Sequence, residues 1–239
     1  MCVSCQKTGV NRRSFLSMAA AGIAAGGVLL TRPSFAADTP TTSVTADEAF
    51  ARLKSGNEKF VSAPQVCAVD LAKQRESAAK AQTPWAAIVT CSDSRLAPEL
   101  LFGGLGVGDL FVARNAGNMV DTATMGTIEY GVEHLGVPLV VVMGHERCGA
   151  VAAACAVVEK HATFPGSIGP MVKAIVPAAR AVYGKPGDFV ENAVRESAKR
   201  TAKQVATRSE IVSHLIKSGK VKVVAARYDL DDGHVEFLG

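Results

Sequence analysis

Four short, mostly apolar runs recur along the chain, and stretches with helical spacing separate them. The runs cover residues 85–91, 109–114, 138–145 and 220–227. Such short runs, rich in β-branched residues, are typical of strands that are buried on both faces of a sheet. Strands that alternate with helices favour a parallel arrangement. The pattern therefore predicts an α/β fold with a mostly parallel central β-sheet flanked by helices.

The segments around these runs predict the helices and one further strand. Thr45 and Glu48 have the spacing of a capping box, which would open a helix that ends near Val61. An Asp-Gly pair inside residues 228–238 predicts a turn into a short antiparallel edge strand. Further helices are expected at residues 69–80, 122–135, 148–160 and 187–217. The first two helices would form an N-terminal helical arm.

Residues 1–36 have the features of an export signal peptide. The pair Arg12 and Arg13 precedes Phe-Leu, a mildly apolar run and a site of small residues that ends at Ala36. This order resembles a twin-arginine signal, whereas a membrane anchor would need an apolar run of about 20 residues. We therefore predict an exported, periplasmic protein with a polar linker at residues 37–44 and one domain at 45–239.

Much of the net positive charge lies in the same N-terminal segment. The chain has 26 basic and 22 acidic residues, and four of the basic residues, but no acidic one, precede residue 37. The remaining charges balance, which leaves no electrostatic footprint for nucleic acid or for an anionic membrane surface. We expect a small-molecule substrate, and neither nucleic acid nor, after signal removal, a membrane as partner.

Reactive side chains follow two of the predicted strands. Cys91 ends the first run, His145 ends the third, and Cys148 stands at the start of the next predicted helix. The carboxyl ends of parallel strands share one edge of a sheet, so these side chains should converge there. A helix N-terminus favours a thiolate. Two thiolates and an imidazole are donors that zinc prefers, and the sequence therefore predicts a zinc site.

Disulfide bonds are the alternative use of cysteine in an exported protein. Cys148 and Cys155 would lie about 10.5 Å apart on one helix, which is too far for a bridge, whereas Cys91 with Cys148 stays geometrically open. We assign no role to Cys67 or Cys155. Asp93 and Arg95 follow Cys91 closely. They could form an ordinary surface ion pair, but beside a metal ligand a supporting role is the better interpretation.

Residues 45–239 resemble the β-class carbonic anhydrases. The resemblance rests on "CSDSR" (91–95), "GDLFVARNAGN" (108–118), "GHERCGA" (144–150) and "VVAARYDLDDGHVEFL" (223–238). It implies one zinc ion per chain held by Cys91, His145 and Cys148, with Asp93 and Arg95 as a paired dyad. It also implies reversible hydration of carbon dioxide to bicarbonate in a homodimer or homotetramer, with residues 45–80 lying over the partner chain.

The chemistry of such a site gives the dyad a role. Three protein ligands leave one zinc position for water, which ionises to a zinc-bound hydroxide and attacks carbon dioxide. Arg95 would hold Asp93 off the metal and aim it at that hydroxide, whereas a released Asp93 would become a fourth ligand and close the site. Two thiolates cancel the charge of the zinc, so activity should favour alkaline pH.

Two other functions remain open from the sequence. The same zinc site could hydrolyse carbonyl sulfide or carbon disulfide, or it could be a closed structural zinc in a non-catalytic module. Some bacterial members of the family also build a second bicarbonate pocket with a Trp three residues before the first ligand Cys. Ile88 stands at that position here, although Arg114 and Tyr228 match the other two members, so that pocket is not expected.

Overall fold

The structure is a computed structural model that describes residues 41–63 and 71–239. The predicted signal at residues 1–36, the first part of the linker and Cys67 lie outside the described residues. Residues 41–44 of the linker adopt neither helix nor strand. No helix in the described ranges is long and apolar enough to cross a membrane.

Five strands form one sheet: β1 (Ala86–Cys91), β2 (Leu110–Asn115), β3 (Leu139–His145), β4 (Lys222–Tyr228) and β5 (Val235–Leu238). Their spatial order is β2-β1-β3-β4-β5, with the first four parallel and β5 antiparallel to β4. This arrangement confirms the predicted fold class. The chain leaves β1 towards β2 and later returns to place β3 on the opposite side of β1, so the direction of winding changes between β1 and β3.

The central strands are buried on both faces, as their composition predicts. Every residue of β1 and β3 is buried. The same prediction is wrong for β2, which lies at the edge of the sheet and has no fully buried residue, and it holds only in part for β4. Ala86 and Ile88 contribute to one apolar cluster, while their neighbours Ala87 and Val89 contribute to another. Successive side chains of a strand point to opposite faces, so a single run of apolar residues supplies two cores.

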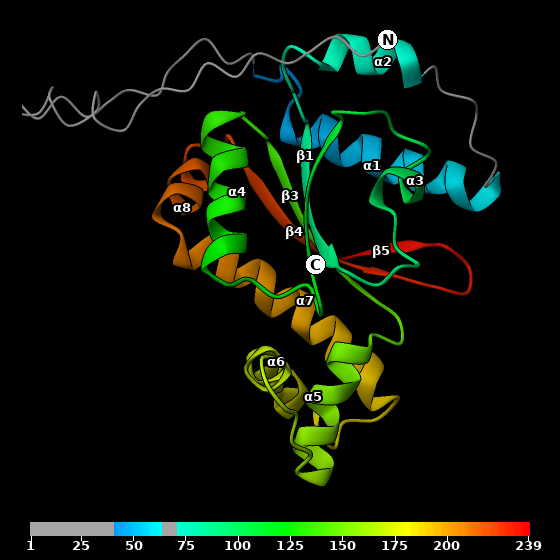
Figure 1. Ribbon diagram of the computed structural model, residues 1–239, viewed down its shortest axis with the longest axis vertical. Coiled ribbons are helices and arrows are strands. Elements are labelled where there is room, and N and C mark those ends of the chain that lie inside the picture. The colour runs from blue at the N-terminus through cyan, green and yellow to red at the C-terminus, as the bar shows by residue number, and fades with distance from the viewer. Residues whose placement is uncertain (1–40, 64–70) are drawn as a thin grey trace, which may run out of the picture. The chain divides into compact units, whose positions relative to one another are not determined.

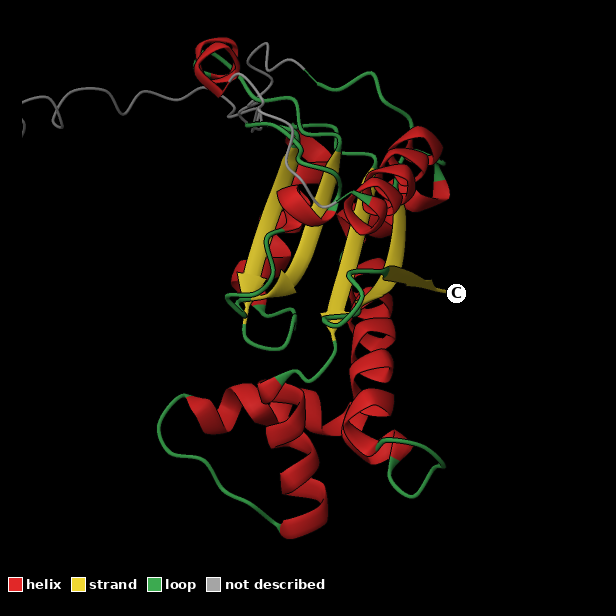
Figure 2. Cartoon of the chain, turned by 90° about the vertical axis from the view of Figure 1, so that its right-hand side faces the viewer, coloured by secondary structure: helices red, strands yellow, loops and turns green. Residues whose placement is uncertain are grey.

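Helices cover both faces of this sheet. Helices α4, α7 and α8 lie over one face, and α1 and α3 lie over the other (Figure 1). Buried residues of α4 and α8 belong to one apolar cluster, those of α1 and α3 belong to the other, and α7 contributes to both. Beyond the carboxyl ends of the strands, α5 and α6 pack together and against α7 (Figures 1 and 2). The bounds are α1 Ala46–Ser62, α2 Leu71–Ala78, α3 Pro98–Leu101, α4 Thr122–His134, α5 Gly149–Lys160, α6 Ile168–Val182, α7 Phe189–Arg208 and α8 Glu210–Lys217.

The predicted capping box at the start of α1 is confirmed. The Thr45 side chain accepts from the backbone N–H of Glu48, and the Glu48 carboxylate accepts from the backbone N–H of Thr45 at 2.8 Å. Helix α1 buries Ala49 and Leu53 in the core of its own chain. The side-chain Nδ2 of Asn57 donates to the carbonyl oxygens of Leu101 and Gly233. These bonds attach α1 to α3 and to the turn that joins β4 and β5. Contact of this segment with a second chain stays a prediction.

The single helix expected at residues 187–217 is wrong. The helix ends at Arg208, and a new one begins after Ser209, whose extended backbone and hydroxyl cap α8 by accepting the N–H of Val212. The Ser209 hydroxyl also donates to Glu129 on α4, and this contact is remote in sequence. The sequence analysis does not include helix α6, and Pro177 lies inside this helix, where proline is unfavourable. The apolar side of α6 nevertheless packs against α5 and α7.

Candidate metal centre and active site

Two adjacent parallel strands carry the first two candidate ligands. Cys91 is the last residue of β1, and His145 is the last residue of β3. The two strands pair directly, at the position where the direction of winding changes. Open α/β sheets keep their sites in this crevice, at the carboxyl ends of the strands. Cys148 is the N-cap residue of α5.

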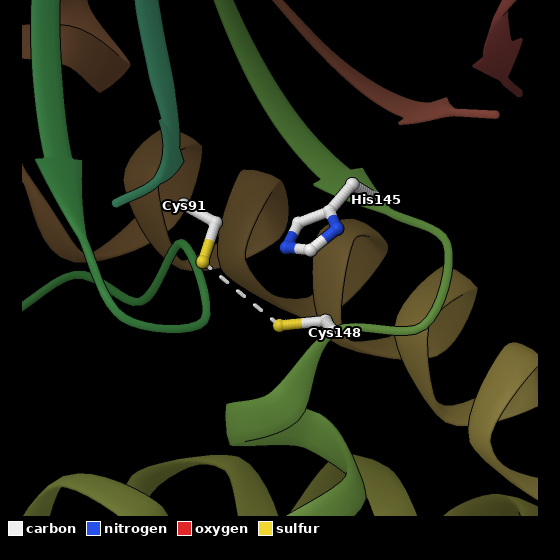
Figure 3. Close-up of side chains that lie close together, drawn as sticks. All are labelled: Cys91, His145 and Cys148. Atoms are coloured by element: carbon white, nitrogen blue, oxygen red, sulfur yellow. Dashed lines mark hydrogen bonds between the residues drawn. The ribbon is translucent and has the colours of Figure 1, made fainter. Parts of the chain in front are cut away.

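The three predicted ligands converge as expected (Figure 3). The sulfur atoms of Cys91 and Cys148 and a ring nitrogen of His145 all lie within 4.8 Å of one another, and all three residues are buried. The two sulfur atoms are 4.0 Å apart, and both cysteines are free. The structure therefore has a thiol pair, rather than the disulfide that the sequence left open. Cys155 is also free and buried in α5.

The donor atoms of this cluster fit a metal ion. The Nδ1 atom of His145 lies 2.8 Å from the carbonyl oxygen of Glu146, while its Nε2 atom is buried without a hydrogen-bond partner. An unpaired buried nitrogen is costly, and a metal would satisfy it. A hydrogen bond from the Cys148 thiol lowers the pKa of Cys91 and raises the pKa of Cys148. Cys91 is therefore the thiol that ionises first, and a thiolate beside a second thiol and an imidazole suits a cation such as zinc.

Asp93 and Arg95 form a two-point ion pair at the edge of this cluster. Arg95 donates from Nε to Oδ1 of Asp93 at 2.9 Å and from Nη2 to Oδ2 at 2.7 Å, and its backbone N–H also donates to Oδ1. These bonds hold the pKa of Asp93 well below its usual range. The Oδ2 atom lies 3.9 Å from Nε2 of His145. All five predicted site residues are therefore together, with an ionised carboxylate beside the ligand atoms.

Two further residues support Cys91, and the sequence analysis assigned them no such role. The backbone N–H of Gly117 donates to the sulfur of Cys91 at 3.3 Å. Arg114 donates to the carbonyl oxygens of Cys91 and Asp93, at 3.1 and 2.7 Å, and so holds the turn between them. Both residues belong to the quoted stretch 108–118, where a strand runs into an Asn-Ala-Gly-Asn turn. The glycine in this turn is the feature of the sequence that could have indicated a close approach of the backbone to Cys91.

Comparison with known proteins identifies the family. Residues 86–235 match the family model described as carbonic anhydrase. "Carbonic anhydrase 2" of Mycobacterium tuberculosis is 37% identical over 198 residues, which cover 81% of this chain and 92% of the mycobacterial protein. The chain belongs to the β-carbonic anhydrase family. It is accordingly an enzyme of the carbonic anhydrase type.

Solved structures of β-carbonic anhydrases have the same fold. The Coccomyxa β-carbonic anhydrase, solved in complex with acetazolamide, has a TM-score of 0.61 and 25% identity, and covers 82% of this chain and 87% of that one. A tetrameric β-carbonic anhydrase of Sordaria macrospora has a TM-score of 0.62 and 24% identity, and the match covers 81% of this chain and 93% of that one. The mostly parallel sheet with one antiparallel edge strand is thus the fold of the family.

Proposed function

We propose that the chain catalyses the reversible hydration of carbon dioxide at one zinc ion held by Cys91, His145 and Cys148. The observation that carries the proposal is the convergence of two thiols with a buried imidazole nitrogen that has no other partner. Zinc bound there would supply the Lewis acidity that makes water nucleophilic near neutral pH. The homology to carbonic anhydrases supports the same substrate.

The residues of the chain then have separate tasks. Asp93 is ionised and can only accept hydrogen bonds. Its Oδ2 atom would therefore accept a hydrogen bond from the attacking water and fix the orientation of that water. Arg95 occupies both carboxylate oxygens and keeps Asp93 from turning towards the metal. Arg114 would limit movement of the turn that carries Asp93, because it bonds to the carbonyl oxygens on both sides of Ser92.

The test is stopped-flow hydration of carbon dioxide by protein that lacks residues 1–36 and whose zinc content has been measured. We expect about one zinc per chain and rapid hydration. The same preparation is assayed for sulfide release from carbonyl sulfide and carbon disulfide. Faster release of sulfide than hydration would favour the hydrolase alternative. Full zinc without hydration at any pH would favour the non-catalytic module.

The ligand assignment gives a first prediction. Cys91→Ser, His145→Ala and Cys148→Ser should each lose zinc and activity, because the described residues offer no second soft donor at this cluster. Cys155→Ser is the matched control, since it removes a buried thiol from the same helix that Cys148 caps and should keep full zinc. Metal analysis decides the matter, and wild-type zinc in any of the three ligand variants would exclude that residue as a ligand.

Export and assembly are further parts of the proposal. The paired arginines and the small-residue site support a twin-arginine signal and a periplasmic location. The homodimer or homotetramer is supported by a structural relative that is tetrameric. Light scattering on the purified protein measures the assembly, and a monomer at micromolar concentration would contradict this part.

A further inference from the structure

The loop that carries two of the three proposed ligands has an unfavourable backbone conformation. It runs from His145 to Cys148, and we call residues 145–148 the ligand loop. Arg147 within it has a φ angle of +52°. Residues other than glycine rarely adopt such angles, which are unfavourable and persist only where surrounding contacts impose them. The contacts of Glu146 and Arg147 should therefore show what holds the loop.

Glu146 is fixed through both its backbone and its side chain. Its backbone N–H donates to the carbonyl oxygen of Tyr228 at 2.9 Å. Its Oε2 atom accepts from the backbone N–H of Leu230 at 3.1 Å. Tyr228 ends β4, and Leu230 lies in the following turn, residues 229–234, which we call the β4–β5 turn. Glu146 thus attaches the ligand loop to a neighbouring part of the sheet that contributes no ligand.

Arg147 makes a second attachment to the same turn. Its Nη1 and Nη2 atoms donate to the two carboxylate oxygens of Asp231, at 2.9 and 2.6 Å, and Nη1 also bonds to Glu146 at 3.0 Å. A two-point pair of this kind fixes orientation as well as distance. The pair forms while Arg147 has its positive φ angle, so it stabilises the loop in this strained conformation.

The electrostatics of the region support both attachments. Carboxylate oxygens of Glu146, Asp229 and Asp231 lie within 4.8 Å of one another. These three negative charges would repel one another without cations. Arg147 pairs with Asp231, and Arg227, only 11% exposed, pairs with Asp229. The arginines therefore turn a repulsive cluster into a connection between the loop and the turn.

The connection reaches a ligand directly. The carbonyl oxygen of Glu146 lies 2.8 Å from Nδ1 of His145, which leaves Nε2 directed at the sulfur atoms. The partner of the non-ligating nitrogen sets the tautomer and orientation of a metal-binding histidine. A shift of Glu146 would consequently turn the imidazole, although Glu146 itself is not one of the three ligands.

We propose that Glu146 and Arg147 are positioning residues that clamp the ligand loop to the β4–β5 turn and orient His145 and Cys148 for the metal. This inference rests on the proposed zinc site and deepens it. The two residues act through His145 and through the backbone course, and neither contacts the metal. Loss of the clamp should therefore weaken and distort metal binding while the fold persists.

The test measures metal binding in full-length wild type and in clamp variants. Zinc Kd is obtained by competition with a chelator, and the visible spectrum of the cobalt(II)-loaded protein reports ligand geometry. Glu146→Ala and Arg147→Ala should weaken zinc binding roughly 10- to 100-fold and alter the cobalt spectrum. Glu146→Gln should retain most of the affinity, because its amide oxygen can still accept from Leu230. Circular dichroism of the metal-free proteins checks that each variant is folded.

Two matched pairs separate the clamp from general effects. Arg147→Gly removes the ion pair but tolerates the positive φ angle, so it should bind zinc more tightly than Arg147→Ala. Asp231→Ala removes the partner of Arg147 and should weaken zinc binding, whereas Asp232→Ala in the same turn should not, since that carboxylate contacts His234. Folded Glu146→Ala and Arg147→Ala proteins with wild-type Kd and cobalt spectra would overturn the clamp alone. Wild type that binds no zinc would overturn the proposed function itself.

Discussion

At the scale of single residues, the Asp93–Arg95 pair predicts that hydration requires Arg95. Arg95→Ala frees a carboxylate whose Oδ2 atom lies 3.9 Å from a ligand nitrogen, so Asp93 can turn to the metal and close the site. We expect poor hydration by this variant even at alkaline pH, with zinc retained. The hydration rate of the wild type should decrease as pH drops below neutrality, again with zinc retained. Stopped-flow rates and metal analysis across pH measure both effects.

The low pKa of Asp93 sharpens this prediction. Asp93 stays ionised far below neutrality because Arg95 donates to both of its oxygens. Its protonation therefore cannot cause a loss of activity near neutral pH. A metal-edge spectrum that finds no carboxylate ligand in acidic wild type or in Arg95→Ala, together with a normal rate for that variant, would refute the gating role.

The backbone conformation and close packing of Gly117 leave no room for a side chain. Its φ angle is +83°, and an added Cβ would lie 2.5 Å from Cδ1 of Ile175 and 3.1 Å from Cβ of Ala150. Gly117→Ala should therefore destabilise the fold by about 1–3 kcal/mol and weaken zinc binding, because it displaces the N–H that donates to Cys91. Gly184→Ala is the control, with a similar φ of +77° and open space around it. Equal urea midpoints for the two variants would contradict a steric cause.

At the scale of elements, the connection between β4 and β5 depends on an ionised aspartate. Burial raises the pKa of Asp229, but bonds from Arg227 and from two backbone N–H groups outweigh it and lower the pKa to about 2. The unfolded value is near 4, so the ionised group stabilises the fold above pH 4, and this contribution disappears as pH falls towards 2. Asp229→Asn should lose on the order of 1–2 kcal/mol at pH 7.

Urea unfolding at two pH values measures this contribution. The difference in unfolding free energy between wild type and Asp229→Asn should be largest at pH 7 and should nearly vanish at pH 2. Asparagine keeps an oxygen that can accept from the N–H groups of Asp231 and Asp232, so the comparison isolates the charge. A difference that stays constant with pH would show that the ion pair with Arg227 does not stabilise the turn.

At the scale of the whole molecule, the site exists only in the folded chain. Two of the three proposed ligands end different strands, and Cys91 and Cys148 are 57 positions apart in the sequence, with β2, α4 and β3 between them. Binding of the proposed zinc should therefore require the folded sheet. A pathway that exports folded proteins would suit such a protein, since zinc could be loaded before export.

This coupling leads to a prediction about the signal. Arg12→Lys combined with Arg13→Lys should leave the precursor in the cytoplasm, yet folded, zinc-loaded and active, because the three proposed ligands all lie in residues 91–148, outside the predicted signal. Arg32→Lys lies in the same segment outside the pair and should be exported normally. Cell fractionation with zinc and activity assays measures the outcome. Undiminished export of the double variant would remove the twin-arginine interpretation.

The strands, most of the helices and the residue types of the candidate ligands could be predicted from the sequence alone. Runs of apolar residues and a capping box are local patterns, and local geometry is enough to interpret them. The two strand ends then brought Cys91 and His145 to one edge, because parallel strands share their carboxyl ends. The convergence of the five candidate residues could therefore be predicted from the sequence.

The groups that hold the candidate ligands in place could not be predicted, because they depend on tertiary contacts. Gly117 reaches Cys91 across 26 positions, and Arg147 reaches Asp231 across 84. At the break between α7 and α8, Ser209 likewise donates to Glu129, which is 80 positions away. Such contacts follow from how strands and helices are stacked, and no local periodicity encodes them. The physical reason is that hydrogen bonds act over about 3 Å in space, whatever the separation along the chain.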